Sequence, residues 1–142
     1  MAQQASRLIF KNANKVAKGK KPHDFFAYLA ETPQLTVSKS GASTIAEFLI
    51  VDHIEKTLCV RAATAVQEVS RLMKESTAHK KEQENEIFAI DIARMTRLHL
   101  IYVTFKMARK RLETHEFTDS NVKAFLMVGL KVFALKQLLL DS

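Results

Sequence analysis

The side chains of this chain that could do chemistry are five histidines, one cysteine and a few acidic clusters. No histidine has a glutamate three residues before it, which argues against the repeated Glu-x-x-His pattern of ferritin-like di-iron sites. His79 and Glu82 have the spacing of one helix face, but they lie in a run of charges that favours a solvated turn. Asp52, His53 and Glu55 could form an acid–base cluster, yet no second element of the sequence requires one. We therefore assign no catalytic and no metal-binding residue.

Other reactive side chains favour structural roles. Cys59 has no histidine nearby in a recognisable motif, so we interpret it as a core thiol. His99 lies one residue off an apolar helical stripe, which favours a buried or boundary histidine. Asp91, Arg94 and Arg97 have the spacing of a salt-bridged helix surface. The sequence has no dinucleotide-binding glycine motif, P-loop, C-x-x-C or H-E-x-x-H pattern, and no cofactor-binding residue is assigned.

The formal net charge of +7 is concentrated at the start of the sequence. Residues 1–23 contain six basic residues and no acidic one, whereas the rest of the chain carries 16 basic and 15 acidic residues. We interpret this segment as the solvated face of a first helix. A transit-peptide-like segment and a basic arm for nucleic acid or an anionic membrane are the alternatives. A nucleic-acid-binding domain normally spreads its charge over a folded face, so we expect no nucleic-acid partner.

Chain breakers are scarce, with three glycines and two prolines in 142 residues. This scarcity favours a few long helices over many short strands, so we predict an all-α fold, an antiparallel bundle of about four long helices. Apolar residues at spacings of three and four predict the helices. Their expected ranges are 2–18, a short helix over 23–29, about 44–76, 86–113, and a last helix that begins at 118–120 and ends near 140.

Capping signals and polar stretches predict where these helices end. Gly19 ends the first helix, whose apolar stripe includes Leu8 and Ile9. Thr44–Glu47 has the pattern of a capping box, in which the hydroxyl and the carboxylate each bind a free backbone N–H. Polar residues over 79–85 and 114–118 predict two turns, and Thr118 or Ser120 caps the last helix.

The last helix is apolar nearly all round, so we expect it to be buried on several sides, with part of its surface against another subunit or a further chain. Lys123, Lys131 and Lys136 interrupt its apolar sequence. Its longest uncharged run, Ala124–Leu130, is too short for the roughly 20 residues that a bilayer requires. We therefore expect no transmembrane segment.

Three segments of the sequence carry a resemblance to a known family. The first is Ala2-Gln3-Gln4-Ala5-Ser6-Arg7-Leu8-Ile9-Phe10-Lys11, followed by Gly19-Lys20-Lys21 and Tyr28-Leu29. The second is Phe48, Arg61-Ala62-Ala63 and Val66, and the third is Asp91-Ile92-Ala93-Arg94, His99, Tyr102-Val103 and Phe105. In this order they resemble the C-terminal helical region of the acyl-CoA oxidases, in the acyl-CoA dehydrogenase-like superfamily. The resemblance covers about residues 2–140.

The resemblance implies a domain organisation and an activity. Residues 1–33 would be the last helix of a preceding bundle plus a short helix, 34–42 a connector, and 43–142 an incomplete oxidase C-terminal-like helical domain. Enzymes of this family bind FAD and convert fatty acyl-CoA and O₂ into trans-2-enoyl-CoA and H₂O₂ in fatty-acid β-oxidation. A glutamate removes the α-proton of the substrate as general base.

The resemblance carries over no site residue, because the family's glutamate lies just upstream of the helix with which this chain begins. Here the first acid is Asp24 and the first glutamate is Glu31, and the domains that contact most of the flavin have no counterpart. We therefore expect a fragment that is inactive alone, binds no FAD, and has a structural or dimerisation role. Its expected partners are a second copy or the missing N-terminal domains.

The resemblance also implies a location, and the apolar last helix supplies an alternative function. The family implies a peroxisome, although the Ser-Lys-Leu type of C-terminal signal is absent, and the cytoplasm is the other expectation. The alternative function is a free-standing helical protein-interaction module that binds a partner helix through the apolar last helix.

Overall fold

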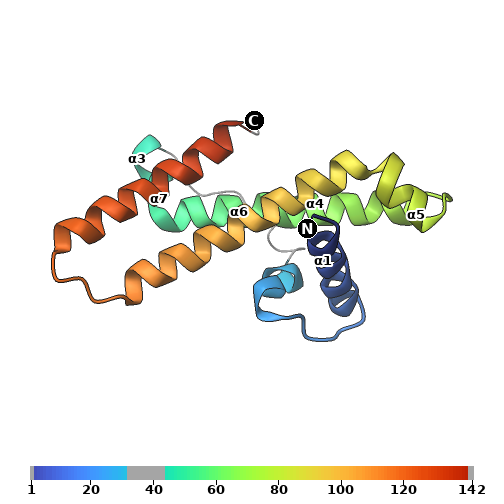
Figure 1. The fold of residues 1–142 in the computed structure, drawn as a ribbon, viewed down its shortest axis with the longest axis horizontal. Coiled ribbons are helices and arrows are strands. Elements are labelled where there is room, and N and C mark those ends of the chain that lie inside the picture. The colour runs from blue at the N-terminus through green and yellow to red at the C-terminus, as the bar shows by residue number, and fades with distance from the viewer. Residues whose placement is uncertain (1, 32–43, 141–142) are drawn as a thin grey trace. The chain divides into compact units, whose positions relative to one another are not determined.

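The computed structural model describes residues 2–31 and 44–140, and these residues form helices and connecting turns without a strand (Figure 1). The elements are α1 Ala2–Ala17, the 3₁₀ helix η1 Asp24–Glu31, α3 Ile45–Phe48, α4 Val51–Glu75, α5 Lys80–Glu82, the π-helix η2 Gln83–Ile87, α6 Ala89–Thr114 and α7 Ser120–Leu140. The all-α prediction is thus confirmed. The predicted connector over 34–42 lies outside the described residues.

The chain divides into two compact units. Among the described residues, the first comprises 2–31 and 59–99, and the second comprises 44–58 and 100–140. The first unit contains α1, η1, α5, η2 and the adjoining parts of α4 and α6. The second contains α3, α7 and the remaining parts of α4 and α6. The predicted domain boundaries at 33 and 43 stay predictions.

In the first unit, α1 ends at a glycine, as its sequence predicts. Gly19 has a φ of +69°, the left-handed region that side chains with a Cβ disfavour. Its N–H donates to the Val16 carbonyl at 3.0 Å, and the Lys20 N–H donates to the Lys15 carbonyl at 2.8 Å. These two bonds form a Schellman motif, which satisfies the last carbonyls of the helix.

The buried face of α1 includes polar residues that the apolar pattern did not predict. Ile9 is fully buried, but Leu8 is half exposed, and Ser6 and Asn12 are buried instead. The Asn12 side chain donates to the Leu8 carbonyl at 2.8 Å and accepts from the His23 N–H at 2.9 Å. Asn12 therefore fixes the start of η1 against α1, and the two helices pack together.

The predicted long helix from residue 44 is interrupted in the second unit. Its capping box is confirmed, because Thr44 and Glu47 bind each other's backbone N–H groups. However, the Ile50 N–H donates to the Glu47 carbonyl, which ends α3, and the Ile50 carbonyl then accepts the first hydrogen bonds of α4. The β-branched pair Ile50–Val51 weakens helix continuation, and Asp52 stabilises the new helix N-terminus.

The turn predicted over 79–85 was placed too late in the chain. α4 ends at Glu75, and residues 80–87 are helical. The buried Gln83 side chain explains the shift, because its amide donates to the Ala78 carbonyl at 2.7 Å and the Ser76 carbonyl at 3.5 Å. A buried side chain thus satisfies the backbone of the actual turn.

The core of both units includes the predicted stripe of α6. The buried residues of that stripe are Ile92, Met95, Leu98, Tyr102 and Phe105. The helix begins at Ala89 instead of residue 86, because the Phe88 N–H donates to the Gln83 carbonyl in the preceding π-helical turn.

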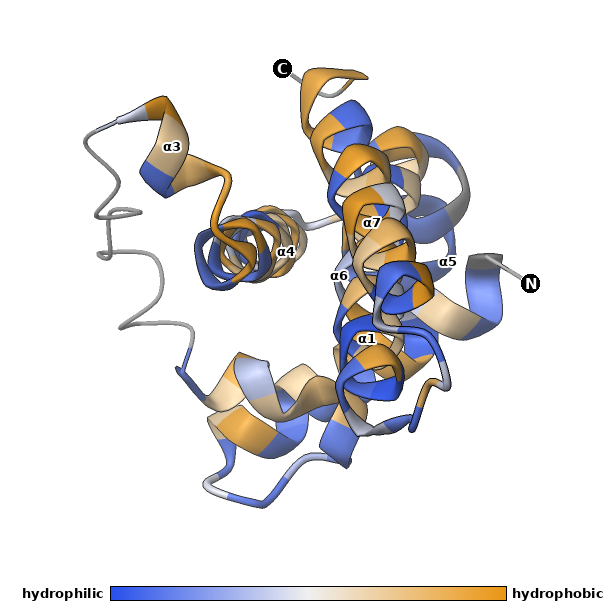
Figure 2. Ribbon diagram, turned by 90° about the vertical axis from the view of Figure 1, so that its left-hand side faces the viewer, coloured by the Kyte–Doolittle hydropathy of each residue, from blue (hydrophilic) through white to orange (hydrophobic). Residues whose placement is uncertain are grey.

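The last helix, α7, differs from its prediction in its cap and in its burial. Asp119 caps it, since its carboxylate accepts from the Asn121 N–H at 2.8 Å, and neither predicted capping residue does so. Within residues 120–140 only Ala134 is buried, whereas Phe125 is 77% exposed and Leu139 is 76% exposed. Figure 2 shows hydrophobic residues along most of α7. None of the helices in the described ranges is long and apolar enough to cross a membrane.

Gly19, which follows α1, and Gly129, which lies within α7, allow a matched test of the backbone conformation at the two positions. We expect Gly19→Ala to lower the free energy of unfolding by about 1 kcal/mol, because the left-handed backbone opposes a Cβ. Gly129→Ala should instead raise it by about 0.5–1 kcal/mol, because the added Cβ meets no atom within 4 Å in the middle of α7. Urea unfolding of both variants measures the difference. Changes of the same sign would contradict the assignment.

Candidate functional site

A buried hydrogen bond joins η1 to α6 in the first unit. The Tyr28 hydroxyl from η1 and the Nδ1 atom of His99 from α6 are 2.6 Å apart, and both side chains are buried. Phe26 stacks on the His99 imidazole, with ring centroids 4.8 Å apart and planes inclined by 4°. The sequence-based expectation of a buried histidine is confirmed. The pattern gave no sign that Tyr28 is its partner.

The electrostatics of this pair favour a structural role over acid–base chemistry. Burial lowers the pKa of His99 to about 4, so its imidazole is neutral near pH 7. Burial, followed by the nearby Cys59 thiol, raises the pKa of Tyr28, so its phenol is neutral as well. A neutral phenol and a neutral imidazole can share one hydrogen bond without a buried charge. The pair therefore joins η1 to α6.

The acidic cluster around residue 53 forms an ion-pair network in the second unit. Arg109 of α6 pairs with Asp52 and Glu55 of α4, each at 2.5 Å, and with Glu113 at 2.8 Å. Burial lowers the pKa of Arg109, but the hydrogen bonds to the carboxylates and the attraction of their charges together raise it overall. The sequence alone assigns no role to Arg109, because its spacing shows no partner within reach on another helix.

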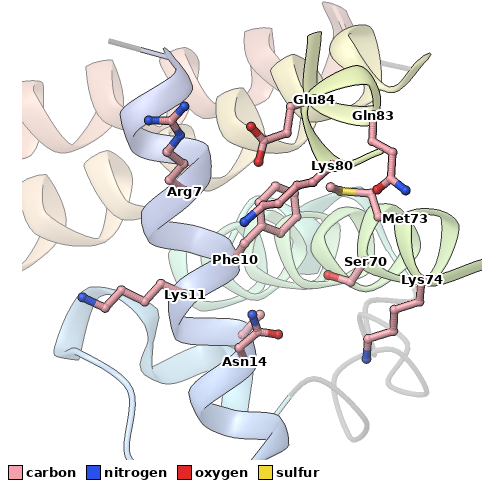
Figure 3. Close-up of a pocket in the computed structure, with 11 residues that line it drawn as sticks. Arg7, Phe10, Lys11, Asn14, Ser70, Met73, Lys74, Lys80, Gln83 and Glu84 are labelled. Atoms are coloured by element: carbon pink, nitrogen blue, oxygen red, sulfur yellow. The ribbon is translucent and has the colours of Figure 1, made fainter. Parts of the chain in front are cut away.

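The first unit also contains a pocket of about 510 Å³ between three helical faces (Figure 3). From α1 it is lined by Arg7, Phe10, Lys11 and Asn14. From α4 it is lined by Ser70, Met73 and Lys74, and from α5 and η2 by Lys80, Gln83 and Glu84. Each group follows the spacing i, i+3, i+4, which places its members on one side of a helix. The pocket is therefore built by the regular geometry of helices.

The other residues that the sequence analysis singled out are exposed where they are charged, and the cysteine is buried. His79 and Glu82 are exposed, as are Asp91, Arg94 and Arg97. Cys59 is buried, as expected for a core thiol. No group of three potential metal ligands occurs within residues 2–31 and 44–140.

Comparison with known proteins found no relative of this chain. No family model matches the chain, and no curated protein and no solved structure matches it.

The buried His99 predicts how stability depends on pH. Its pKa is about 4 in the folded state and 6.5 ordinarily, so the unfolded chain binds the proton first as the pH falls. The stabilisation is complete above pH 6.5 and is lost toward pH 4, by up to about 3 kcal/mol in the free energy of unfolding. We expect His99→Gln, which keeps a polar partner for Tyr28, to remove this part of the slope. Urea unfolding from pH 7 to pH 4 measures both proteins, and equal slopes would contradict the prediction.

The Arg109 network predicts a contrast between two arginines. Arg109→Gln should lower the free energy of unfolding by about 1–3 kcal/mol, because the side chain is only 17% exposed and three carboxylates lose their partner. Arg71→Gln is the matched control, since Arg71 pairs with Glu68 and Glu75 on the surface of one helix. We expect a smaller loss there, because solvent screens exposed pairs. Thermal and urea unfolding compare the two variants, and an equal loss would contradict the assignment.

Proposed function

We propose that this chain is the C-terminal helical region of an FAD-dependent acyl-CoA oxidase of fatty-acid β-oxidation, folded as an antiparallel bundle of about four long helices. The intact enzyme would convert acyl-CoA and O₂ into trans-2-enoyl-CoA and H₂O₂. In this proposal the chain has an assembly role, because none of its residues matches the family's catalytic glutamate motif.

The residues that carry the family resemblance support a structural role. Ala62 and Ala63 of the Arg-Ala-Ala segment are fully buried, and His99 of the third segment is 4% exposed. These residues pack the core. A segment whose characteristic residues serve packing suits a supporting domain.

One observation carries the assembly role, and it is the exposed apolar face of α7. Its members follow a helical spacing along one side: Val122, Phe125, Leu126, Val132, Phe133 and Leu140. The exposed Lys136 is the charged residue of this face, whereas Ala134, Lys123 and Lys131 lie toward the covered side. Apolar residues dominate the exposed side of α7, which is the reverse of an ordinary surface helix. Such a face marks an interaction site.

The extent of this face suits a second copy of the chain. The exposed fractions of the six residues of this face correspond to roughly 600 Å² of surface, and the adjoining Val128 and Leu139 bring the total to roughly 800 Å², the area that each partner contributes to a standard interface. The same face on two copies is self-complementary in its chemistry, as a two-fold symmetric interface requires. We therefore take self-association through α7 as the assembly contact.

The alternative of a free-standing interaction module rests on the same face. An apolar helix side can accept a different partner helix as well as its own copy. A chain that stays monomeric over a wide concentration range would favour this alternative.

Charge substitutions on α7 test the assembly role. We expect the chain to dimerise, and Phe125→Glu to weaken the dimer by roughly tenfold or more, because a carboxylate would be buried without a partner. Ile90→Glu is the matched control, since Ile90 is 85% exposed on α6 outside this face. Sedimentation equilibrium over a range of concentrations measures all three proteins. Equal weakening by both substitutions, or a wild-type chain that never associates, would overturn self-association through α7.

The oxidase part of the proposal has a separate test. The purified chain should show no flavin absorbance and should release no H₂O₂ from acyl-CoA with added FAD. Turnover by this chain alone would refute the assignment of a supporting region. This outcome is independent of whether α7 dimerises.

A further inference from the structure

The pocket of the first unit gathers positive charge from three helical segments. Arg7 and Lys11 come from α1, Lys74 from α4 and Lys80 from α5, against the single carboxylate of Glu84. These segments meet only in the folded chain. The charge is therefore a property of the pocket, and the basic N-terminal sequence supplies only half of its cations.

These charges lack the compensation found elsewhere in the same unit. Arg71, which follows the lining residue Ser70 in α4, pairs with Glu68 at 2.7 Å and Glu75 at 2.9 Å. None of the four pocket cations forms an ion pair within the described ranges. Moreover, Arg7 and Lys11 are four residues apart on one helix, where like charges are mutually destabilising. An anion in the pocket would relieve this repulsion.

The floor of the pocket has a different chemistry from its rim. Figure 3 shows Phe10 of α1 and Met73 of α4 facing one another, with Lys80 extending toward them. In this view Arg7 lies further along α1, and Lys11 and Lys74 extend outward from α1 and α4 at the edge of the pocket. Phe10 and Met73 are half-buried, so they offer a ring face and a thioether that water only partly covers. A thioether and an aromatic ring are good contacts for a flat ring.

We propose that this pocket binds a nucleotide, with the base on Phe10 and Met73 and the phosphates among the cations of the rim. A cavity of about 510 Å³ falls within the size range of small-molecule sites. Neutral polar groups complete the lining, with the amide of Asn14 and the hydroxyl of Ser70 beside the cations. Arginine and lysine bind phosphate oxygens through charge-assisted hydrogen bonds, which are stronger than neutral ones. This inference is independent of the oxidase assignment.

Titration calorimetry with three probes tests the assignment on the full chain. ADP carries a base and phosphates, inorganic pyrophosphate carries only the phosphates, and adenosine lacks them. We expect ADP to bind more tightly than either of the other two. Phe10→Leu should reduce ADP binding to the level of pyrophosphate and leave pyrophosphate binding unchanged.

Charge variants locate the site within the fold. We expect Lys80→Gln and Arg7→Gln each to weaken ADP binding by roughly tenfold, because each removes a charge-assisted contact. Lys56→Gln is the control with the same charge change, since Lys56 is exposed on α4 and does not line the pocket. Circular dichroism confirms that each variant is folded.

Several results would overturn the proposal. An absence of ADP binding would do so, as would equal affinity for ADP and pyrophosphate, because the apolar floor would then have no role. Equal weakening by Lys56→Gln and Lys80→Gln would show attraction by net charge alone. Loss of binding on substitution of Arg7 but not of Lys80 would assign the interaction to the basic N-terminal segment instead of the pocket.

Discussion

The hydrogen bond between Tyr28 and His99 is the interaction on which the first unit depends. It joins residues 71 positions apart in sequence, and it places η1 against α6. Both groups are buried, so breaking this hydrogen bond would cost part of their desolvation free energy. Asn12 then fixes the beginning of η1 to α1, so the position of η1 also sets the position of α1. Arg7 and Lys11 of α1 then line one pocket together with residues of α4 and α5.

The sequence predicted those features that depend on neighbours along the chain. The α6 stripe, the capping box at Thr44 and the end of α1 at Gly19 all follow from local spacing and backbone geometry. The features that it missed depend on side chains reaching across turns or between helices. Gln83 moves a turn, Asn12 buries a polar face, and Arg109 collects carboxylates from two helices. In the sequence alone, each of these residues cannot be distinguished from an ordinary polar surface residue, because its partner is not known.

The pocket illustrates the same limit in a sharper form. Each of its three lining segments places a cation among residues at i, i+3 and i+4, and Phe10 and Met73 are the apolar members on α1 and α4. Such a mixture is found on many partly solvated helix sides. The three segments differ from ordinary helix sides only because tertiary contacts bring them together around one pocket. The pocket and the exposed side of α7 also differ in kind, one concave and cationic, the other apolar and helical. They lie in different units, so each can be disabled without the other.

Cys59 has a practical consequence that its packing role does not suggest. It is the single thiol of the chain, and it is 7% exposed on α4 beside the core of the first unit. A thiol-specific reagent therefore reaches it only when this unit opens. Under conditions where opening and closing are fast relative to alkylation, the labelling rate reports the equilibrium population of the open form. Alkylation of Cys59 in the wild-type chain can therefore measure local unfolding without an engineered probe.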